Sequence, residues 1–92
     1  MRLEWSPRAT DAYVASLTLI AENDRLTAEL VRERVDRALA AILEFPGLGT
    51  PVLKRGMRSF AVPNTGHVLQ YRVIGDVVRI RLWYRARQNI RR

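Results

Sequence analysis

The chain has 92 residues, a formal net charge of +7 and no cysteine. A chain of this length can bury one core, which predicts a single domain over residues 1–92. It has no disulfide framework or thiolate metal site, and its one histidine cannot hold a metal alone. No apolar run approaches the roughly 20 residues that cross a bilayer, and the amino terminus lacks a signal-peptide pattern. We therefore expect a cytoplasmic protein with no metal and no membrane contact.

The charge is unevenly distributed along the chain. Up to Glu44, six Lys and Arg stand against eight Asp and Glu, a balance of −2; after it, ten stand against one, a balance of +9. Such a basic surface attracts nucleic acid, a ribosome or an acidic protein partner. The alternative is that these arginines only keep an open sheet face soluble, although charge placed for solubility usually mixes both signs.

The amino-terminal residues predict a short strand followed by a helix. Residues 2–5 alternate polar and apolar side chains, as in a strand with Leu3 and Trp5 turned inward. Ser6, which precedes a proline, is a favourable helix cap, and the helix should end near Asn23. Its packing stripe follows a spacing of three to four residues and contains Ala9, Ala12, Tyr13, Leu17 and Ile20.

A second helix follows, capped by either Asp24 or Thr27, and ends near Phe45 because a proline comes next. Few residues separate the two helices, so we expect them to pack antiparallel as a helical hairpin. The packing face of the second helix contains Val31, Val35, Ala38, Leu39, Ile42 and Phe45.

Residues 47–51 form a glycine-containing loop that is superficially like a phosphate cradle. No Lys-Ser or Lys-Thr pair follows it, and it does not join a strand to a helix. We therefore expect no nucleotide site, no cofactor and no small-molecule ligand.

The carboxyl-terminal half predicts three strands in a meander. Residues 57–62 alternate with Phe60 and Val62 inward, and a turn over residues 63–66 leads into two strands, residues 68–74 and 77–84, joined at Gly75-Asp76. The last strand runs on into residues 85–87. The order of elements predicts an α+β fold, in which the amino-terminal strand and helical hairpin pack on one face of a small antiparallel sheet whose other face is open.

A period of two divides the side chains of the last strand between the two faces of the sheet. It assigns Val78, Ile80, Leu82 and Tyr84 to the core, together with Leu69, Tyr71 and Val73 of the preceding strand. It assigns Arg79, Arg81, Trp83 and Arg85 to the open face. The sequence therefore predicts a basic stripe with one aromatic residue, suited to an acidic protein or nucleic acid.

Several segments in this order resemble the RelE/ParE toxins of bacterial toxin–antitoxin modules. They are Ser6-Pro7-Arg8-Ala9, Leu43-Glu44-Phe45-Pro46-Gly47-Leu48-Gly49, Gly56-Met57-Arg58, Leu69-Gln70-Tyr71-Arg72-Val73, Val78-Arg79-Ile80 and Arg85-Ala86-Arg87. The resemblance covers nearly the whole chain and implies the toxin fold of that family.

The RelE branch of the family cuts messenger RNA on the ribosome, using basic and tyrosine side chains that stabilise the charge of the transition state. Aligned with that branch, two catalytic lysines fall at Ser59 and Ala61, and an arginine falls at Val68. A late arginine is retained at Arg87, but no tyrosine follows it. The resemblance thus implies that most of the catalytic residues of the RelE branch are missing from this chain. A RelE-like endoribonuclease is kept as the alternative function.

The ParE branch inhibits DNA gyrase by binding and is not enzymatic. The helix-end and strand motifs are closer to this branch, as are Arg85 and Arg87 at the end of the last strand. Many ParE proteins carry a histidine just before those arginines, where this chain has Trp83 and Tyr84. The resemblance implies a ParE-like toxin that acts on gyrase; a toxin fold without toxicity, kept as a binding or autoregulatory module, is a further alternative.

The candidate target-binding residues are Arg58, Arg79, Arg81, Trp83, Arg85 and Arg87, and no catalytic residue is assigned. Arg58 either touches the target or pairs with Asp76 or another carboxylate. His67 stands at a turn, where a solvated histidine is preferred over a general acid or base because it has no evident carboxylate partner.

The resemblance also implies a cognate antitoxin that lays a helix against the helical hairpin and adds a strand to the sheet edge. An acidic antitoxin would complement the basic half of the chain. We expect its helix to use the groove between the two helices and to contact exposed apolar residues such as Leu19 and Leu30.

Overall fold

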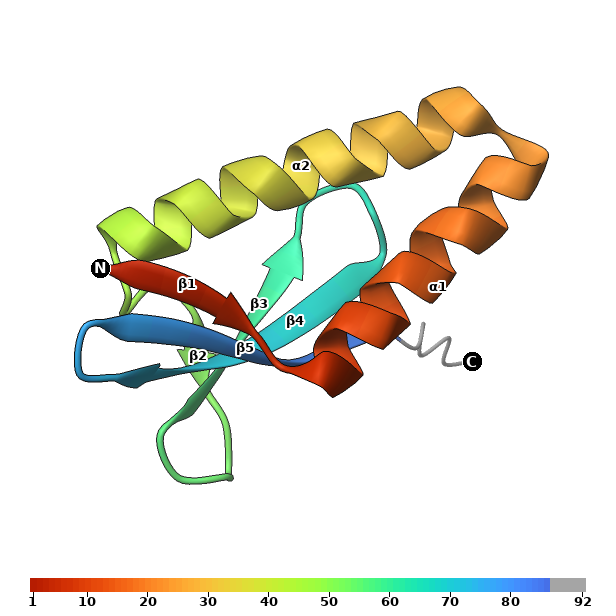
Figure 1. The fold of residues 1–92 in the computed structure, drawn as a ribbon. Coiled ribbons are helices and arrows are strands. Elements are labelled where there is room, and N and C mark those ends of the chain that lie inside the picture. Colours follow the sequence, from red (N-terminus) through yellow and green to blue (C-terminus); the bar gives the residue numbers. More distant parts are fainter. Residues whose placement is uncertain (87–92) are drawn as a thin grey trace, which may run out of the picture.

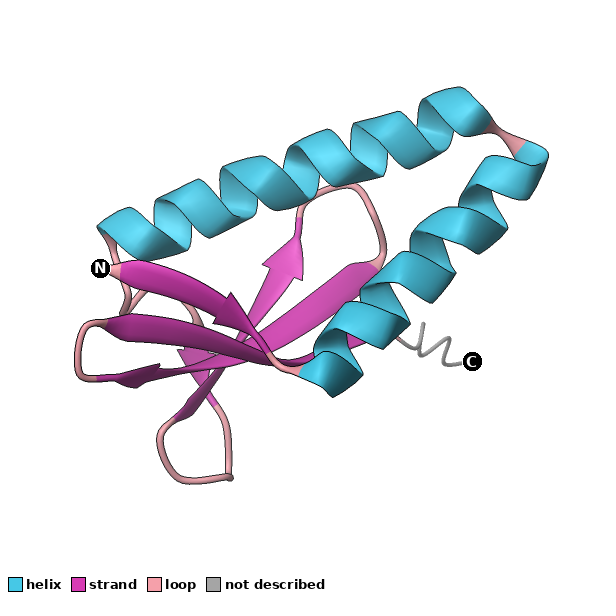
Figure 2. Ribbon diagram, viewed as in Figure 1, coloured by secondary structure: helices cyan, strands magenta, loops and turns pink. Residues whose placement is uncertain are grey.

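The computed structural model describes residues 1–86 of the chain. Two helices lie on one face of a five-stranded sheet, as Figures 1 and 2 show. The elements are β1 (Arg2–Trp5), α1 (Pro7–Asn23), α2 (Arg25–Glu44), β2 (Thr50–Pro51), β3 (Met57–Val62), β4 (His67–Ile74) and β5 (Val77–Arg85). The α+β class and the order of the predicted elements are confirmed.

The sheet has the strand order β1-β5-β4-β3-β2 and is mixed, because β1 runs parallel to β5 while the other neighbours are antiparallel. The expectation of a wholly antiparallel sheet is wrong for β1, since alternation reveals the faces of a strand but not its direction. The short strand β2 lies in the segment expected to be a loop and pairs with residues 58 and 59 of β3.

Both helices begin at the caps that the sequence offers. The Ser6 hydroxyl accepts a hydrogen bond from the Ala9 amide at 3.1 Å. An Asp24 carboxylate oxygen accepts from the Thr27 amide at 3.2 Å, and the other accepts from the Thr27 hydroxyl at 2.7 Å. These bonds favour the ionised carboxylate and hold the pKa of Asp24 below its usual value. From the turn at Asp24 the helices diverge as an open V over the sheet (Figure 1).

The core lies between the helices and the covered face of the sheet, and the two predicted helical stripes supply much of it. Val35, Ile42, Leu69 and Ile80 are fully buried. Phe45 is the exception, with 62% of its surface exposed. It lies one residue beyond the end of α2 in a non-helical conformation, so helical spacing no longer turns its side chain inward.

A β-bulge in β5 changes the faces predicted for the end of that strand. Tyr71 lies opposite Ile80, but Gln70 lies opposite Leu82, so that Arg81 is an extra residue without a partner in β4. Because side chains alternate with a period of two, one extra residue reverses the face of every residue after it. Beyond the bulge, Trp83 therefore lies on the core face and Tyr84 on the open face.

Ser6 fastens the junction of β1 and α1 to this bulge. Its amide donates a hydrogen bond to the Ile80 carbonyl at 2.9 Å, and its hydroxyl donates to the Arg81 carbonyl at 3.2 Å. The same hydroxyl accepts from the Ala9 amide, so that one buried side chain caps the helix and satisfies a carbonyl of the bulge.

Replacing Ser6 with alanine should lower the free energy of unfolding by about 1–3 kcal/mol, because the cap and the bond to the bulge are lost together. Denaturant unfolding of the Ser6→Ala and Thr18→Ala variants measures this. Thr18 is exposed on α1, so its replacement should not destabilise the protein. Equal stability of both variants would show that the Ser6 bonds contribute nothing.

Candidate functional site

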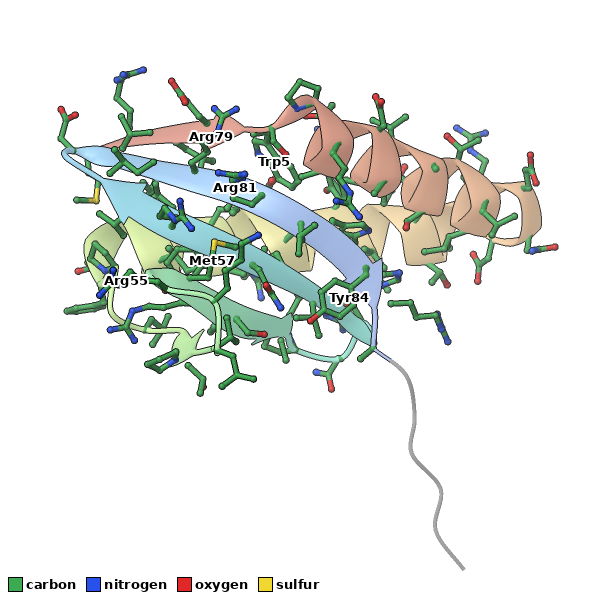
Figure 3. The ribbon with its side chains drawn as sticks, turned by 90° about the horizontal axis from the view of Figure 1, so that it is seen from below. Trp5, Arg55, Met57, Arg79, Arg81 and Tyr84 are labelled. Atoms are coloured by element: carbon green, nitrogen blue, oxygen red, sulfur yellow. The ribbon has the colours of Figure 1, made fainter. Side chains whose placement is uncertain are left out.

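The basic stripe predicted for one face of the sheet is divided between two faces by the bulge. Figure 3 views the open face, where Arg79 and Arg81 lie together with Met57 and Tyr84. Trp83 and Arg85 follow the bulge and lie on the helix-covered side, where their partners in β4 are Leu69 and His67. The stripe predicted by simple alternation is therefore wrong beyond residue 81.

Trp83 is a core residue and not part of an exposed binding surface. Only 4% of it is exposed, and its indole N–H donates a hydrogen bond to the Ser16 hydroxyl at 2.9 Å. Its ring packs edge-on against Tyr13 and stacks on His67, with 4.8 Å between ring centroids in each pair. Tyr13 in turn stacks on Trp5, with 5.1 Å between centroids. These four rings join three strands to α1. Burial raises the pKa of Tyr13 above its usual value, and the negative charge of Asp36 raises it further.

His67 is buried rather than solvated, which corrects the expectation for this residue. It is 4% exposed, and its Nδ1 lies 3.1 Å from the Thr65 carbonyl oxygen. A carbonyl only accepts, so the proton of the neutral ring belongs on Nδ1. Burial lowers the pKa of His67, and the nearby charge of Arg85 lowers it further. His67 is a neutral packing residue near neutral pH.

Two further arginines predicted to bind a target are held by the protein itself. The Arg79 guanidinium lies 2.8 Å from the Glu4 carboxylate of β1. Arg58 donates to the carbonyls of Gly47 and Gly49 at 3.2 and 2.7 Å. The alternative partner for Arg58, Asp76 or another carboxylate, is therefore wrong, because this side chain points to the loop after α2.

The same loop explains the packing role of Tyr71, which is fully buried as predicted. Its hydroxyl donates to the Pro46 carbonyl and accepts from the Gly49 amide, both at 2.8 Å. A Cβ on Gly49 would lie 2.9 Å from the Tyr71 ring and hydroxyl, so only glycine fits there. Tyr84, by contrast, was predicted to face the core and is 40% exposed on the open face.

Arg81 and Arg85 keep exposed surface and belong to different faces. Arg85 is exposed at the end of β5, opposite His67. Arg87 lies outside the described residues. Of the arginine pair predicted at the end of the strand, Arg85 lies on the helix-covered side of the sheet.

A basic hollow on the open face was not predicted from the sequence. Its volume is about 160 Å³, and it is lined by the basic residues Arg8, Lys54, Arg72 and Arg81 and by the apolar residues Met57 and Leu82. Arg72 and Arg81 come from β4 and β5. Arg8 and Lys54 come from α1 and from the loop before β3, and no spacing rule places such residues together.

The positions that align with RelE catalytic residues lie on the same face, in the rows next to this hollow, and Leu82 of the hollow shares a row with Ser59. Ala61, Val68 and Tyr84 lie side by side on β3, β4 and β5, and Ser59 is opposite Gln70 in the next row. Tyr84 accepts a hydrogen bond from the Gln70 amide at 3.1 Å. Among residues 1–86, these neighbouring positions hold no cation.

The helical pair exposes the apolar residues predicted to contact an antitoxin. Leu19 is 63% and Leu30 45% exposed. A hollow of about 260 Å³ lies between α1, α2 and β1, but neither leucine lines it. Its lining is Trp5, Thr10, Tyr13, Val35, Asp36 and Leu39.

Within residues 1–86, no group of three His, Cys, Asp or Glu side chains gathers as a metal ion would require. Neither described helix combines the length and apolarity of a membrane span.

Comparison with known proteins identifies the family. Residues 3–89 match the family described as ParE toxin of type II toxin-antitoxin system, parDE. The chain belongs to this ParE toxin family. A search of curated proteins found no match.

Solved structures share the fold. A chain of the chromosomal ParDE system from P. aeruginosa is similar with a TM-score of 0.82 and 17% identity, over 95% of this chain and 97% of that one. The isolated E. coli RelE toxin is similar with a TM-score of 0.70 and 20% identity, over 95% and 85%. A chain of the E. coli RelBE toxin-antitoxin complex is similar with a TM-score of 0.68 and 20% identity, over 94% of this chain and 96% of that one. The similar structures thus include both a ParDE system and RelE toxins.

The buried, neutral His67 makes stability depend on pH. Above about pH 6.5 the ring is neutral in both states, and as the pH falls the unfolded chain gains a proton before the folded one. The free energy of unfolding should therefore fall below that pH, by at most about 1.4 kcal/mol per pH unit. Denaturant unfolding at several pH values, for the natural chain and His67→Phe, isolates this contribution. An unchanged difference between the two proteins from about pH 7.5 to 5.5 would contradict it.

Proposed function

We propose that this member of the ParE family is a toxin that inhibits DNA gyrase by binding it, without catalysis of its own. The observation that carries the proposal is the row across the open face in which Ala61 and Val68 replace aligned RelE cations. RNA cleavage needs preorganised positive charge where the transition state becomes negative. The row of Ala61, Val68 and Tyr84 holds no cation.

The neighbouring titratable side chains support the same conclusion. His67 belongs to β4, but its ring is buried beneath Trp83 on the other side of the sheet. A general base must reach the proton that it removes, and His67 is out of reach of a substrate on the open face. Tyr84 is exposed on that face, but its described hydrogen-bond partner is the neutral amide of Gln70.

Arg85 and Arg87 are the proposed contacts to gyrase. Arg85 is exposed and makes no ion pair within the described part of the chain, in contrast to Arg79. An exposed arginine provides planar, multidentate recognition of acidic groups on a protein surface. This proposal places the protein in the cytoplasm, together with gyrase.

Replacing both arginines with alanine should raise the concentration that half-inhibits DNA supercoiling by purified gyrase by roughly tenfold or more, as expected when arginine contacts at an interface are lost. Arg25→Ala, which removes an exposed arginine at the start of α2, is the matched control and should inhibit like the natural chain.

Failure of the natural chain to inhibit supercoiling at all would overturn the gyrase proposal. Site-specific cleavage of ribosome-bound messenger RNA by the purified chain would replace it with the RelE-like activity. Absence of both effects would identify a binding or autoregulatory module on the same fold.

We further propose that an acidic antitoxin covers the helical pair, with Leu19 and Leu30 among its apolar contacts. Membership of a type II toxin–antitoxin family supports this, as does the charge of the carboxyl-terminal half of the chain. The RelBE structure is itself described as a toxin-antitoxin complex. Both leucines are exposed, so a partner that covers them would gain the free energy of burying apolar surface.

Leu19→Asp and Leu30→Asp should each weaken the toxin–antitoxin complex by roughly tenfold or more, since each removes a buried leucine contact worth about 1.5–3 kcal/mol. Calorimetric titration with the cognate antitoxin measures the affinity. Leu53→Asp is the control, because Leu53 is fully exposed in the loop before β3. An affinity unchanged by both helix substitutions counts against this surface.

A further inference from the structure

The basic hollow on the open face is assembled from four separate parts of the chain. Arg8 comes from the first turn of α1, Lys54 from the loop before β3, Arg72 from β4 and Arg81 from the bulge in β5. The bond from Ser6 to the Arg81 carbonyl fixes the start of α1 beside the bulge, and Arg8 follows Ser6 closely. The fold itself therefore brings these charges to one place.

No carboxylate of the described residues neutralises this group. The ion pairs of residues 1–86 join Glu4 to Arg2 and to Arg79. Arg79 lies directly opposite Arg72 across the sheet, so Arg72 has another cation as its neighbour. Glu4 compensates the charge of Arg79, so the uncompensated cations are the four at the hollow, and a ligand of opposite charge would lower their mutual repulsion.

Arg72 also contains a polar group that needs an acceptor. One of its terminal nitrogens donates to the Arg55 carbonyl at 3.1 Å, but its Nε–H is buried and has no partner. A buried donor without an acceptor costs about 1–3 kcal/mol, so native proteins rarely leave one unmatched. Arg72 lines the hollow, so a bound oxyanion would change the surroundings of this unpaired group.

We propose that this hollow binds one phosphate group. Its volume of about 160 Å³ is small compared with pockets for drug-sized ligands, and it suits a compact oxyanion. A phosphate offers several acceptor oxygens and up to two negative charges, which match three guanidinium groups and an ammonium better than a carboxylate does. Met57 and Leu82 also line the hollow, and apolar surface beside a charge strengthens its attraction to an anion.

The Arg72 Nε–H belongs to a side chain that lines the hollow, so its NMR signal reports occupancy of the hollow in solution. Its NMR signal, assigned by its loss in Arg72→Lys, is followed in the full-length chain as inorganic phosphate is added, with sodium chloride at matched ionic strength as the reference. A saturable shift with phosphate but not with chloride is expected. No shift, or equal shifts with both salts, would overturn the site.

Matched variants separate the hollow from general basic charge. Lys54→Gln and Arg81→Gln should each weaken phosphate binding by roughly tenfold or more, as for loss of a charge-assisted hydrogen bond. Lys54 is in an exposed loop, so its replacement leaves the core intact. Arg25→Gln removes the same charge elsewhere and should bind phosphate like the natural chain. Equal weakening by Arg25→Gln would show nonspecific attraction and overturn the site.

The same signal distinguishes the source of the phosphate. If a short oligothymidylate shifts the Arg72 signal at lower concentration than inorganic phosphate, the group belongs to a nucleic acid backbone. If inorganic phosphate binds more tightly, the site takes free phosphate. The isolated protein is used without gyrase, so this result is independent of whether the proposed inhibition holds.

Discussion

The rest of the structure depends on the bulge at Arg81 and on the buried serine that holds it. Ser6 bonds to the backbone of residues 80 and 81, so the start of α1 and the irregular point of β5 are fixed together. The extra residue turns Trp83 into the core, where its indole N–H finds the Ser16 hydroxyl and its ring contacts two other rings. A tryptophan buries roughly 150–250 Å² of surface, a gain that offsets the interrupted strand pairing.

The bulge also determines what the open face can do. It leaves Arg81 and Leu82 at a basic hollow, and it turns Tyr84 onto the open face beside Val68 in the next row. The positions that align with RelE catalytic residues hold no charge among the described residues, whereas the cations lie next to them, where the start of α1 meets the sheet. This separation agrees better with a protein that binds its target than with one that cleaves RNA.

Much of the fold follows from local patterns in the sequence. Helix caps at Ser6 and Asp24, the 3.6-residue stripes and the tight turn at Gly75 depend on neighbours in the chain, so they are predictable. The faces of the last strand were predicted correctly only as far as Arg81. A period of two assumes an unbroken strand, and Leu82, Trp83 and Tyr84 are all largely apolar, so either assignment of faces fits them.

The candidate site was less predictable for the same reason. Arg79 and Arg58 looked available in the sequence, but their partners, Glu4 and the carbonyls of Gly47 and Gly49, come from distant parts of the chain. The hollow likewise joins residues from α1, a loop and two strands, and such long-range meetings leave no local pattern. The exposure of Leu19 and Leu30 was predictable, because helical periodicity excludes them from the packing stripes.

The central claim is that the chain acts by binding gyrase and not by cutting messenger RNA. Pulse labelling of DNA and protein synthesis in bacteria, within minutes of inducing the chain without an antitoxin, tests it most directly. Binding to gyrase predicts that DNA synthesis fails first while protein synthesis continues. Protein synthesis failing first would contradict this account and point to a nuclease site on the open face.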